Sequence, residues 1–327
     1  MHRILEFYSG IGGMHYAFQL SNNPGEILAA FDINTTANSV YKHNLEKDKR
    51  KSIVQQSLPI SYYDSFNANM WLMSPPCQPY TRMGLHQGSS DLRAKSFLYL
   101  IDMLSKMSFP PTYILIENVK GFEDSDTRNT LVTQLKNCNY NFQEFFITPL
   151  QLGIPNSRLR YYILRSNDII NILNNKDSDS LLSNLNTIPI SDFLQDDVNH
   201  EKYSIPNKTL IKYGKLFDIV KPSSHRSCCF TKGYHHYVEA TGSILQLGED
   251  LDSDQIFNSA TISEQNIDLI SRLKLRYFTE REVASIMGFP KDFSFPDELT
   301  LKQRYRVLGN SINVKVVAEL IKYLLLD

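Results

Sequence analysis

Residues 4–13 spell Ile-Leu-Glu-Phe-Tyr-Ser-Gly-Ile-Gly-Gly, an apolar strand pattern that continues directly into a glycine-rich turn. Glycines in such a turn let the backbone approach a ligand closely, and the following helix N-terminus offers amide donors to an anionic group. The next expected strand ends at Asp32, about twenty residues on, where an acid can accept ribose hydroxyls. Because the spacing is not G-x-G-x-x-G, the pattern favours a smaller adenosine ligand over a nicotinamide cofactor. A purely structural tight turn is the alternative.

The first half of the chain alternates short apolar runs with longer amphipathic stretches. The expected strands cover residues 4–7, 27–31, 71–73, 113–116, 142–147 and 161–164. The expected helices cover residues 14–20, 35–45, 94–106 and 127–138. This rhythm predicts an α/β fold with a doubly wound parallel sheet, whose ligands bind beyond the carboxyl ends of the strands.

The sequence pattern changes after residue 166, where a polar tract over 171–180 predicts a linker. We expect a cofactor-binding catalytic domain over 1–170 and a small, irregular substrate domain over 171–275. A C-terminal segment over 276–327 should return to the first domain. Within it, Thr279 and Glu282 have the spacing of a helix capping box, and an amphipathic pattern predicts a last helix over 314–326.

The composition is that of an ordinary globular protein, with 42% hydrophobic residues among 327 and a formal net charge of −1. Any nucleic-acid surface must therefore be local. The four cysteines show neither a disulfide framework nor metal spacing, which favours a reducing compartment and no bound metal. Because no apolar run is long enough to span a bilayer, we expect no membrane contact and an intracellular protein, cytoplasmic or nuclear.

A rigid loop follows the expected strand at 71–73: Ser74-Pro75-Pro76-Cys77-Gln78-Pro79. Two prolines fix φ at successive positions and end the strand, so the Cys77 thiol is held at the ligand end of the sheet. Such placement suits a nucleophile. The alternative is an inert, buried cysteine, the usual state of a free thiol.

Three other segments carry polar groups at similar places. Glu117 follows four apolar residues, where it either caps the next helix or meets a ligand. Alternation sends Arg158 and Arg160 to one side of a starting strand, where they either serve the site or pair with surface acids. The stretch at 309–313 opens the last helix, where it either contributes to the site or only caps the helix.

In chain order, residues 7–13, 74–78, 117–119, 151–160 and 309–313 resemble the motif series of cytosine-5 methyltransferases. The stretches at 74–82 and 153–158, together with the tripeptide Cys229-Phe230-Thr231, resemble the DNA methyltransferase 2 family in particular. This resemblance implies a Rossmann-like class I methyltransferase sheet with a small target recognition domain. It also implies S-adenosyl-L-methionine as cofactor, S-adenosyl-L-homocysteine as product, and aspartate tRNA as substrate, at the anticodon-loop cytosine of position 38, with DNA as a weaker substrate.

The resemblance also assigns roles to individual residues. Catalysis falls to Cys77, which would add to cytosine C6, and to Glu117, Arg158 and Arg160. Cofactor binding falls to Phe7, Gly10, Ile11, Gly12, Gly13, Asp32, Ile33, Gln56, Pro76, Asn310 and Ser311. Substrate binding falls to Gln78, Asn118, Val119, Cys229, Phe230 and Thr231. Gln56 and Asn69 stand where relatives have acids, so we expect weaker cofactor affinity and intact catalysis.

Other functions stay open at this point. The chain is alternatively a DNA cytosine-5 methyltransferase or a catalytically weak nucleic-acid-binding homologue. A zinc site built from Cys228, Cys229, His235 and His236 lacks standard spacing. Candidate phosphate contacts, with solvated surface charge as the alternative role, are Arg82, Arg93, Lys95, Lys120, Lys232 and Arg276.

Overall fold

The computed structural model describes residues 1–45, 52–53, 58–76, 92–165, 187–237, 239–259 and 267–326. The chain divides into two compact units. Unit 1 comprises Met1–Thr148, Leu159–Asp179 and Ile312–Asp327. Unit 2 comprises Pro149–Arg158 and Ser180–Ser311. The predicted linker tract lies outside the described residues.

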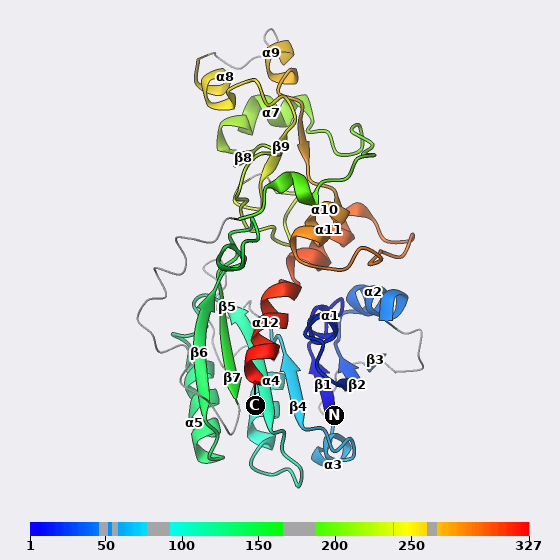
Figure 1. Cartoon of the computed structure of the whole chain (residues 1–327), viewed down its shortest axis with the longest axis vertical. Coiled ribbons are helices and arrows are strands. Elements are labelled where there is room, and N and C mark those ends of the chain that lie inside the picture. Colours follow the sequence, from blue (N-terminus) through cyan, green and yellow to red (C-terminus); the bar gives the residue numbers. More distant parts are fainter. Residues whose placement is uncertain are drawn as a thin grey trace. The chain divides into compact units, whose positions relative to one another are not determined.

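Unit 1 is built on a seven-stranded sheet of order β3-β2-β1-β4-β5-β7-β6, in which neighbouring strands come from distant parts of the chain (Figure 1). Its strands are β1 (His2–Phe7), β2 (Gly25–Phe31), β3 (Ser52–Ile53), β4 (Met70–Met73), β5 (Tyr113–Val119), β6 (Phe142–Ile147) and β7 (Arg160–Arg165). The six predicted strands all form, with small differences at their ends.

The prediction of a wholly parallel sheet is wrong for β7, which pairs antiparallel with both β5 and β6. A parallel neighbour needs a long crossover, usually a helix, to carry the chain back to the other end of the sheet. Between β6 and β7 the structure has only a short 3-10 helix, η2 (Pro149–Leu152). The chain therefore re-enters the sheet at the edge where it left.

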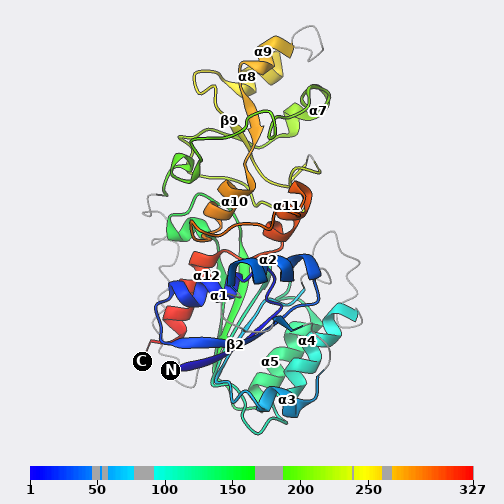
Figure 2. The ribbon, with the colours of Figure 1, turned by 90° about the vertical axis from the view of Figure 1, so that its right-hand side faces the viewer.

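Helices cover both faces of this sheet, with α1 and α12 on one side and α3, α4 and α5 on the other (Figure 2). They are α1 (Gly13–Leu20), α2 (Thr35–Leu45), α3 (Ile60–Asp64), α4 (Leu92–Met103), α5 (Asp126–Asn137) and α12 (Val314–Leu324). Alternation along β1 sends Leu5 and Phe7 into the core shared with α4 and α5. The last helix packs against α1, as its amphipathic pattern predicts.

Unit 2 holds a three-stranded sheet of order β10-β9-β8 surrounded by short helices. Its elements are η3 (Ile190–Phe193), α7 (Asn207–Tyr213), η4 (Gly214–Leu216), β8 (Ile219–Val220), β9 (Ile244–Gln246), α8 (Ser253–Ser259), α9 (Ile267–Ser271), β10 (Leu275–Tyr277), α10 (Glu280–Ile286) and α11 (Leu301–Gly309). The predicted capping box forms at α10, where Thr279 and Glu282 exchange hydrogen bonds.

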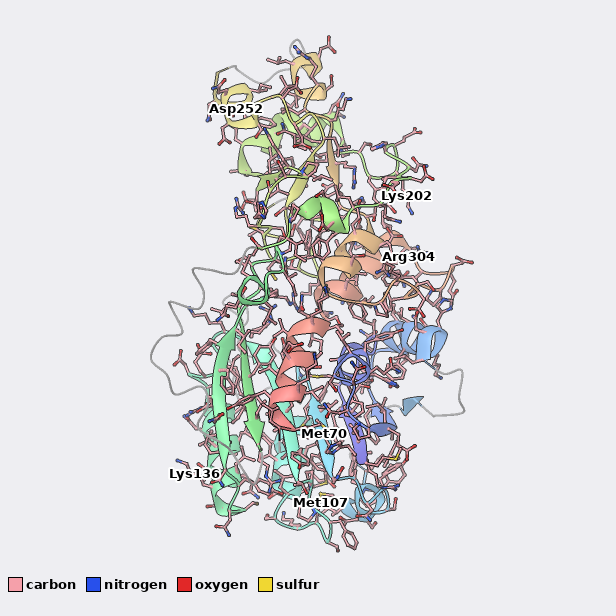
Figure 3. All side chains as sticks on the ribbon, in the orientation of Figure 1. Met70, Met107, Lys136, Lys202, Asp252 and Arg304 are labelled. Carbon is pink, nitrogen blue, oxygen red and sulfur yellow. The ribbon has the colours of Figure 1, made fainter. Side chains whose placement is uncertain are left out.

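Unit 2 contains buried ion pairs in addition to its apolar core. Arg276 lies 2.8 Å from Glu282, and both side chains are almost inaccessible. This burial excludes Arg276 from the phosphate contacts considered above, because its guanidinium has no access to solvent. Glu280 binds Arg304 at 2.9 Å and Lys202 at 3.7 Å, two residues labelled in Figure 3.

The units divide the chain differently from the expected boundaries at 170/171 and 275/276. Residues 276–311 group with unit 2, because their contacts lie there: the Tyr305 hydroxyl, for example, donates to the Phe278 carbonyl. Only the chain from Ile312 onward groups with unit 1. The segment Pro149–Arg158 also belongs to unit 2, although it connects two strands of unit 1.

Candidate active site

The glycine turn after β1 is held by backbone hydrogen bonds. The Ser9 N–H donates to the Phe31 carbonyl at 3.0 Å, and the Gly12 N–H donates to the Ser9 carbonyl at 2.9 Å. Gly12 has a φ of +87°, and a Cβ there would lie 2.4 Å from Cδ1 of Leu45. Both observations favour glycine at this position. The first amides of α1 follow directly, an arrangement that suits a carboxylate or phosphate.

Asp32 follows β2 and braces the turn from the neighbouring strand. Its Oδ2 accepts the Gly10 N–H at 2.8 Å, and its Oδ1 accepts the Asn34 N–H at 2.7 Å. Burial raises the pKa of Asp32, and the hydrogen bonds from Asn34 and Gly10 oppose that rise. Each carboxylate oxygen has a second acceptor position, so the Asp32 side chain can still receive ribose hydroxyls.

Two side chains beside the turn fit a nucleoside ligand. The Ser9 hydroxyl is buried, and no hydrogen-bond partner for it exists among the described residues. The Ile33 side chain next to Asp32 is 68% exposed, which leaves its aliphatic surface available for a flat ring. Pro76 is half-buried on the loop after β4. An unsatisfied hydroxyl, an acid and an apolar surface are the groups that such a ligand would use.

Two residues expected to bind the cofactor have their side chains in the core, and their cofactor-binding roles stay predictions. The Phe7 ring stacks on Phe31 with 5.0 Å between centroids, and Ile11 is almost wholly inaccessible. Only their backbone groups can face a ligand. Their side chains fix the turn to unit 1.

Hydrogen bonds join the loops that follow β1 and β4 to each other and to the end of β5. The Ser74 N–H donates to the Phe7 carbonyl at 3.3 Å, and the Ser74 hydroxyl donates to the Tyr8 carbonyl at 3.0 Å. The Asn118 side-chain amide donates to the Pro75 carbonyl at 3.4 Å. The carboxyl ends of three adjacent strands therefore meet at one edge of the sheet, where a doubly wound fold places its ligands.

Three expected site residues, Cys77, Gln78 and Gln56, lie outside the described residues, so their roles stay predictions. Asn69 is described, and it does not lie at the ligand edge. It precedes β4 at the opposite edge, where its Oδ1 accepts the Arg3 N–H at 2.8 Å. The expectation that Asn69 weakens cofactor binding is therefore wrong.

Glu117 lies near the end of β5, almost buried, and pairs with Arg160. The Nε of Arg160 is 3.3 Å from Oε1 of Glu117. The pair forms because β7 runs antiparallel to β5, which brings the start of β7 beside the end of β5. The helix-capping alternative for Glu117 is excluded, because Ser125 caps the next helix by accepting the Arg128 N–H. A guanidinium at this distance stabilises the negative carboxylate and fixes its orientation.

Arg158 has different partners from Arg160. Strand β7 begins at Arg160, so Arg158 lies before it and belongs to unit 2. Its guanidinium donates to Cys229 Sγ at 3.2 Å and to the Phe230 carbonyl at 3.3 Å. It also donates to the carbonyls of Gly309 and Ser311. Arg158 thus links two of the sequence motifs inside unit 2, a role that alternation did not predict.

The tripeptide Cys229-Phe230-Thr231 makes its contacts within unit 2. Phe230 is buried, with its ring 5.3 Å from that of Phe278. The Thr231 N–H donates to the Thr241 carbonyl at 2.8 Å. A Cβ at Gly309 would lie 2.1 Å from the backbone of Thr231, so α11 can approach this segment only with glycine there.

The stretch at 309–313 spans two helices instead of opening one. Asn310 ends α11, whereas Asn313 caps α12 by accepting the Val316 N–H at 3.2 Å. Asn310 is exposed and Ser311 is half-buried. Their cofactor-binding roles stay predictions.

Three residues near the ligand edge were missed by sequence reasoning. Tyr8 has a φ of +57°, and nothing in the sequence indicates a left-handed tyrosine. Sequence reasoning included Ser74 only as the first residue of the loop after the expected strand at 71–73 and gave it no role of its own. Glu6 did carry a signal, since a carboxylate inside an apolar strand needs partners when buried.

Within the described part of the chain, no helix is long and apolar enough to cross a membrane. The same residues contain no group of three or more histidine, cysteine, aspartate or glutamate side chains arranged to hold a metal ion.

Comparison with known proteins places the chain in a family. A family model described as C-5 cytosine-specific DNA methylase matches residues 2–325. The chain belongs to this family. It is accordingly a cytosine-5 methyltransferase, and its fold is the Rossmann-like class I methyltransferase fold.

Individual members of the family match over nearly their whole length. The tRNA (cytosine(38)-C(5))-methyltransferase of Spodoptera frugiperda is 44% identical over 338 residues, with 99% of each chain covered. The human protein of the same name is 40% identical over 385 residues, with 98% of each covered. The crystal structure of the S. pombe Dnmt2 methyltransferase matches with a TM-score of 0.86 and 41% identity, covering 99% of this chain and 98% of that one. The resemblance to the DNA methyltransferase 2 family is confirmed.

The different partners of the two arginines lead to a stability prediction. Arg158→Lys should lower the free energy of unfolding by about 2–4 kcal/mol, because lysine cannot reach all the acceptors that the guanidinium binds. Arg160→Lys is the matched control and should cost only about 1 kcal/mol, because lysine can still pair with Glu117. Urea unfolding followed by circular dichroism measures both changes. Equal losses would contradict the distinction between the two residues.

Proposed function

We propose that this cytosine-5 methyltransferase modifies tRNA at cytosine 38 of the anticodon loop, with aspartate tRNA as the substrate and S-adenosylmethionine as the methyl donor. Two relatives that match along almost the whole chain are named for tRNA cytosine 38. The structural observation that supports the proposal most strongly is the meeting of the glycine turn, the Ser74 loop and Glu117 at one sheet edge.

The described residues of the turn fit the proposed cofactor. The first amides of α1 would receive its carboxylate, and Asp32 would receive its ribose hydroxyls. The exposed Ile33 side chain would cover its adenine ring. When bound, the cofactor supplies an electrophilic methyl group and leaves as S-adenosylhomocysteine.

Cytosine C5 is a weak nucleophile, so the base needs activation before methyl transfer. In the proposed mechanism the Cys77 thiolate adds to C6, which makes C5 electron-rich. C5 then forms the bond to the methyl group. Loss of the C5 proton to a base restores the ring double bond and expels the thiolate. One difficult step is thereby divided into easier ones.

Glu117 and Arg160 would orient the base during this reaction. The Glu117 carboxylate, fixed by its ion pair with Arg160, can accept a hydrogen bond from the exocyclic amine of cytosine. Uracil lacks this amine. The guanidinium beside it would add positive charge where the ring accumulates electron density. Because Arg158 already donates to four acceptors inside unit 2, we assign it a supporting role.

The target base must leave its stack to reach such a site. A base in a loop costs less to extrude than a paired base, which favours an RNA loop over duplex DNA. DNA remains the alternative substrate, since the matching family model carries the name of DNA methylases.

A surface of unit 2 supports nucleic-acid binding. Lys302 and Arg306 are both exposed and lie one turn apart on α11. Lys302 Nζ is 3.2 Å from Nε2 of His236, and the neighbouring Tyr237 is 64% exposed, with its ring 4.6 Å from that of His236. We call this the α11 patch; it also includes the exposed Lys232, whose backbone packs against Gly309. Cations beside an exposed aromatic ring suit phosphates and an unstacked base.

The covalent step predicts a trapped complex. An RNA hairpin carrying 5-fluorocytosine at the target position cannot lose a C5 proton, so the Cys77 adduct should persist after methyl transfer. Wild type with S-adenosylmethionine should give a complex stable in detergent gels, and Cys77→Ala should give none. Cys138→Ala is the matched control and should trap as wild type does, because it keeps Cys77; burial raises the pKa of the Cys138 thiol, which disfavours the thiolate there. Trapping by Cys77→Ala would overturn the mechanism.

The α11 patch predicts a salt-dependent loss of affinity. Lys302→Ala with Arg306→Ala should weaken tRNA binding roughly tenfold or more and reduce the slope of log K against log salt by about 2, one for each phosphate contact. Lys106→Ala with Lys136→Ala removes two exposed cations from unit 1 and serves as the control. Filter binding over a salt series measures both. An unchanged salt slope in the first variant would remove the patch from the interface.

A further inference from the structure

Glu6 is a buried carboxyl group beneath the glycine turn that the proposed mechanism does not use. It lies on β1 and is completely inaccessible to solvent. Its neighbours Leu5 and Phe7 point into the core shared with α4 and α5, so alternation sends Glu6 to the opposite face. That face is covered by α1, the helix that the glycine turn begins.

Three residues from three elements are joined by hydrogen bonds there. Oε1 of Glu6 accepts the His15 N–H of α1 at 3.2 Å, and Oε2 accepts the Tyr41 hydroxyl of α2 at 3.0 Å. The same hydroxyl lies 2.8 Å from Nδ1 of His15. The Tyr41 ring would lie 3.3 Å from a Cβ at Gly12, so the network supports the turn directly.

The surroundings of Glu6 disfavour its charge. Burial raises the pKa of Glu6 to about 8, with a smaller contribution from the negative charge of Asp32, while the hydrogen bonds from Tyr41 and His15 oppose the rise. The groups that face it are thus Asp32 after β2, His15 on α1 and Tyr41 on α2. This environment favours the neutral carboxyl over the carboxylate.

We propose that Glu6 is a positioning residue for the cofactor turn, and that it acts as a neutral acid hydrogen-bonded to Tyr41 and His15. The proposal rests on the proposed cofactor, whose carboxylate would bind at the first amides of α1. Glu6 accepts one of those amides, and on ionisation it would place a full negative charge there and a second one beside Asp32. It would therefore compete with the cofactor carboxylate for the positive end of the helix.

The direction of the pH dependence follows from this competition. A ligand that prefers the protonated form binds fully below the Glu6 pKa and loses affinity as pH rises through it. Above about pH 8 the affinity should fall by up to about tenfold per pH unit. Glu6→Gln keeps a neutral side chain of the same shape and should bind equally well on both sides of that pH.

The binding experiment uses S-adenosylhomocysteine and isothermal titration calorimetry at a series of pH values on both sides of pH 8. Titration of the ligand itself affects every protein alike, so the ratio of wild-type to Glu6→Gln affinity isolates Glu6. Tyr41→Phe removes a hydrogen bond that lowers the Glu6 pKa, so the loss of affinity should begin at higher pH. Tyr63→Phe changes a buried tyrosine on the other face of the sheet and should follow wild type.

A second measurement needs no cofactor. A raised pKa in the folded state makes wild type lose stability relative to Glu6→Gln as pH rises from the ordinary glutamate value of 4.5 to about 8, with no further loss above. Urea unfolding at several pH values measures this difference. A constant difference would show that Glu6 does not bind a proton in the fold and would overturn the proposal.

The outcomes separate this proposal from the proposed function. Parallel pH profiles of S-adenosylhomocysteine binding in wild type and Glu6→Gln would overturn the positioning role and leave the cofactor assignment intact. Absence of binding by every variant at every pH would overturn both. A break near pH 8 in wild type that is absent in Glu6→Gln and shifted upward in Tyr41→Phe is the expected result.

Discussion

The parallel pairing of β1, β4 and β5 is the constraint on which the site depends. Phe7 pairs with Met73 and Met73 pairs with Ile116, so β1 and β4 end level with each other, and Glu117 of β5 is the next residue after this level. Because parallel strands finish at the same edge, one register brings the glycine turn, the Ser74 loop and Glu117 together. A slip of one residue would exchange the side chains that face the two helical layers. The chemistry thus depends on the same apolar contacts that stabilise the sheet.

Much of this edge could be predicted from the sequence, because it follows from local patterns. Short β-rich runs gave the strands, and the glycines, prolines and acids after them marked where a ligand belongs. The direction of β7 could not be predicted, since it depends on whether residues 148–159 form a helix. That single reversal brings Arg160 beside Glu117 and leaves Arg158 outside the strand. Alternation alone treated the two arginines as equivalent.

The remaining differences between prediction and structure come mainly from contacts between residues distant in sequence. Asn69 is an exception, because it precedes the same strand that Ser74 follows, and the expected strand at 71–73 already places the two at opposite edges. Arg158 is buried by partners distant in sequence, whereas the burial of Arg276 depends on the packing of the whole unit. Glu6 illustrates a signal that was visible and left unexplained: an acid within an apolar strand, whose partners come from two helices.

We propose that this edge of the sheet methylates C5 of a cytosine in an RNA loop. The most direct test of this proposal is bisulfite sequencing of total tRNA and genomic DNA after incubation of the purified protein with S-adenosylmethionine. We expect a protected cytosine at position 38 of aspartate tRNA, little protection elsewhere in tRNA, and little in DNA. Preferential protection of DNA cytosines, or of paired cytosines in tRNA, would contradict it.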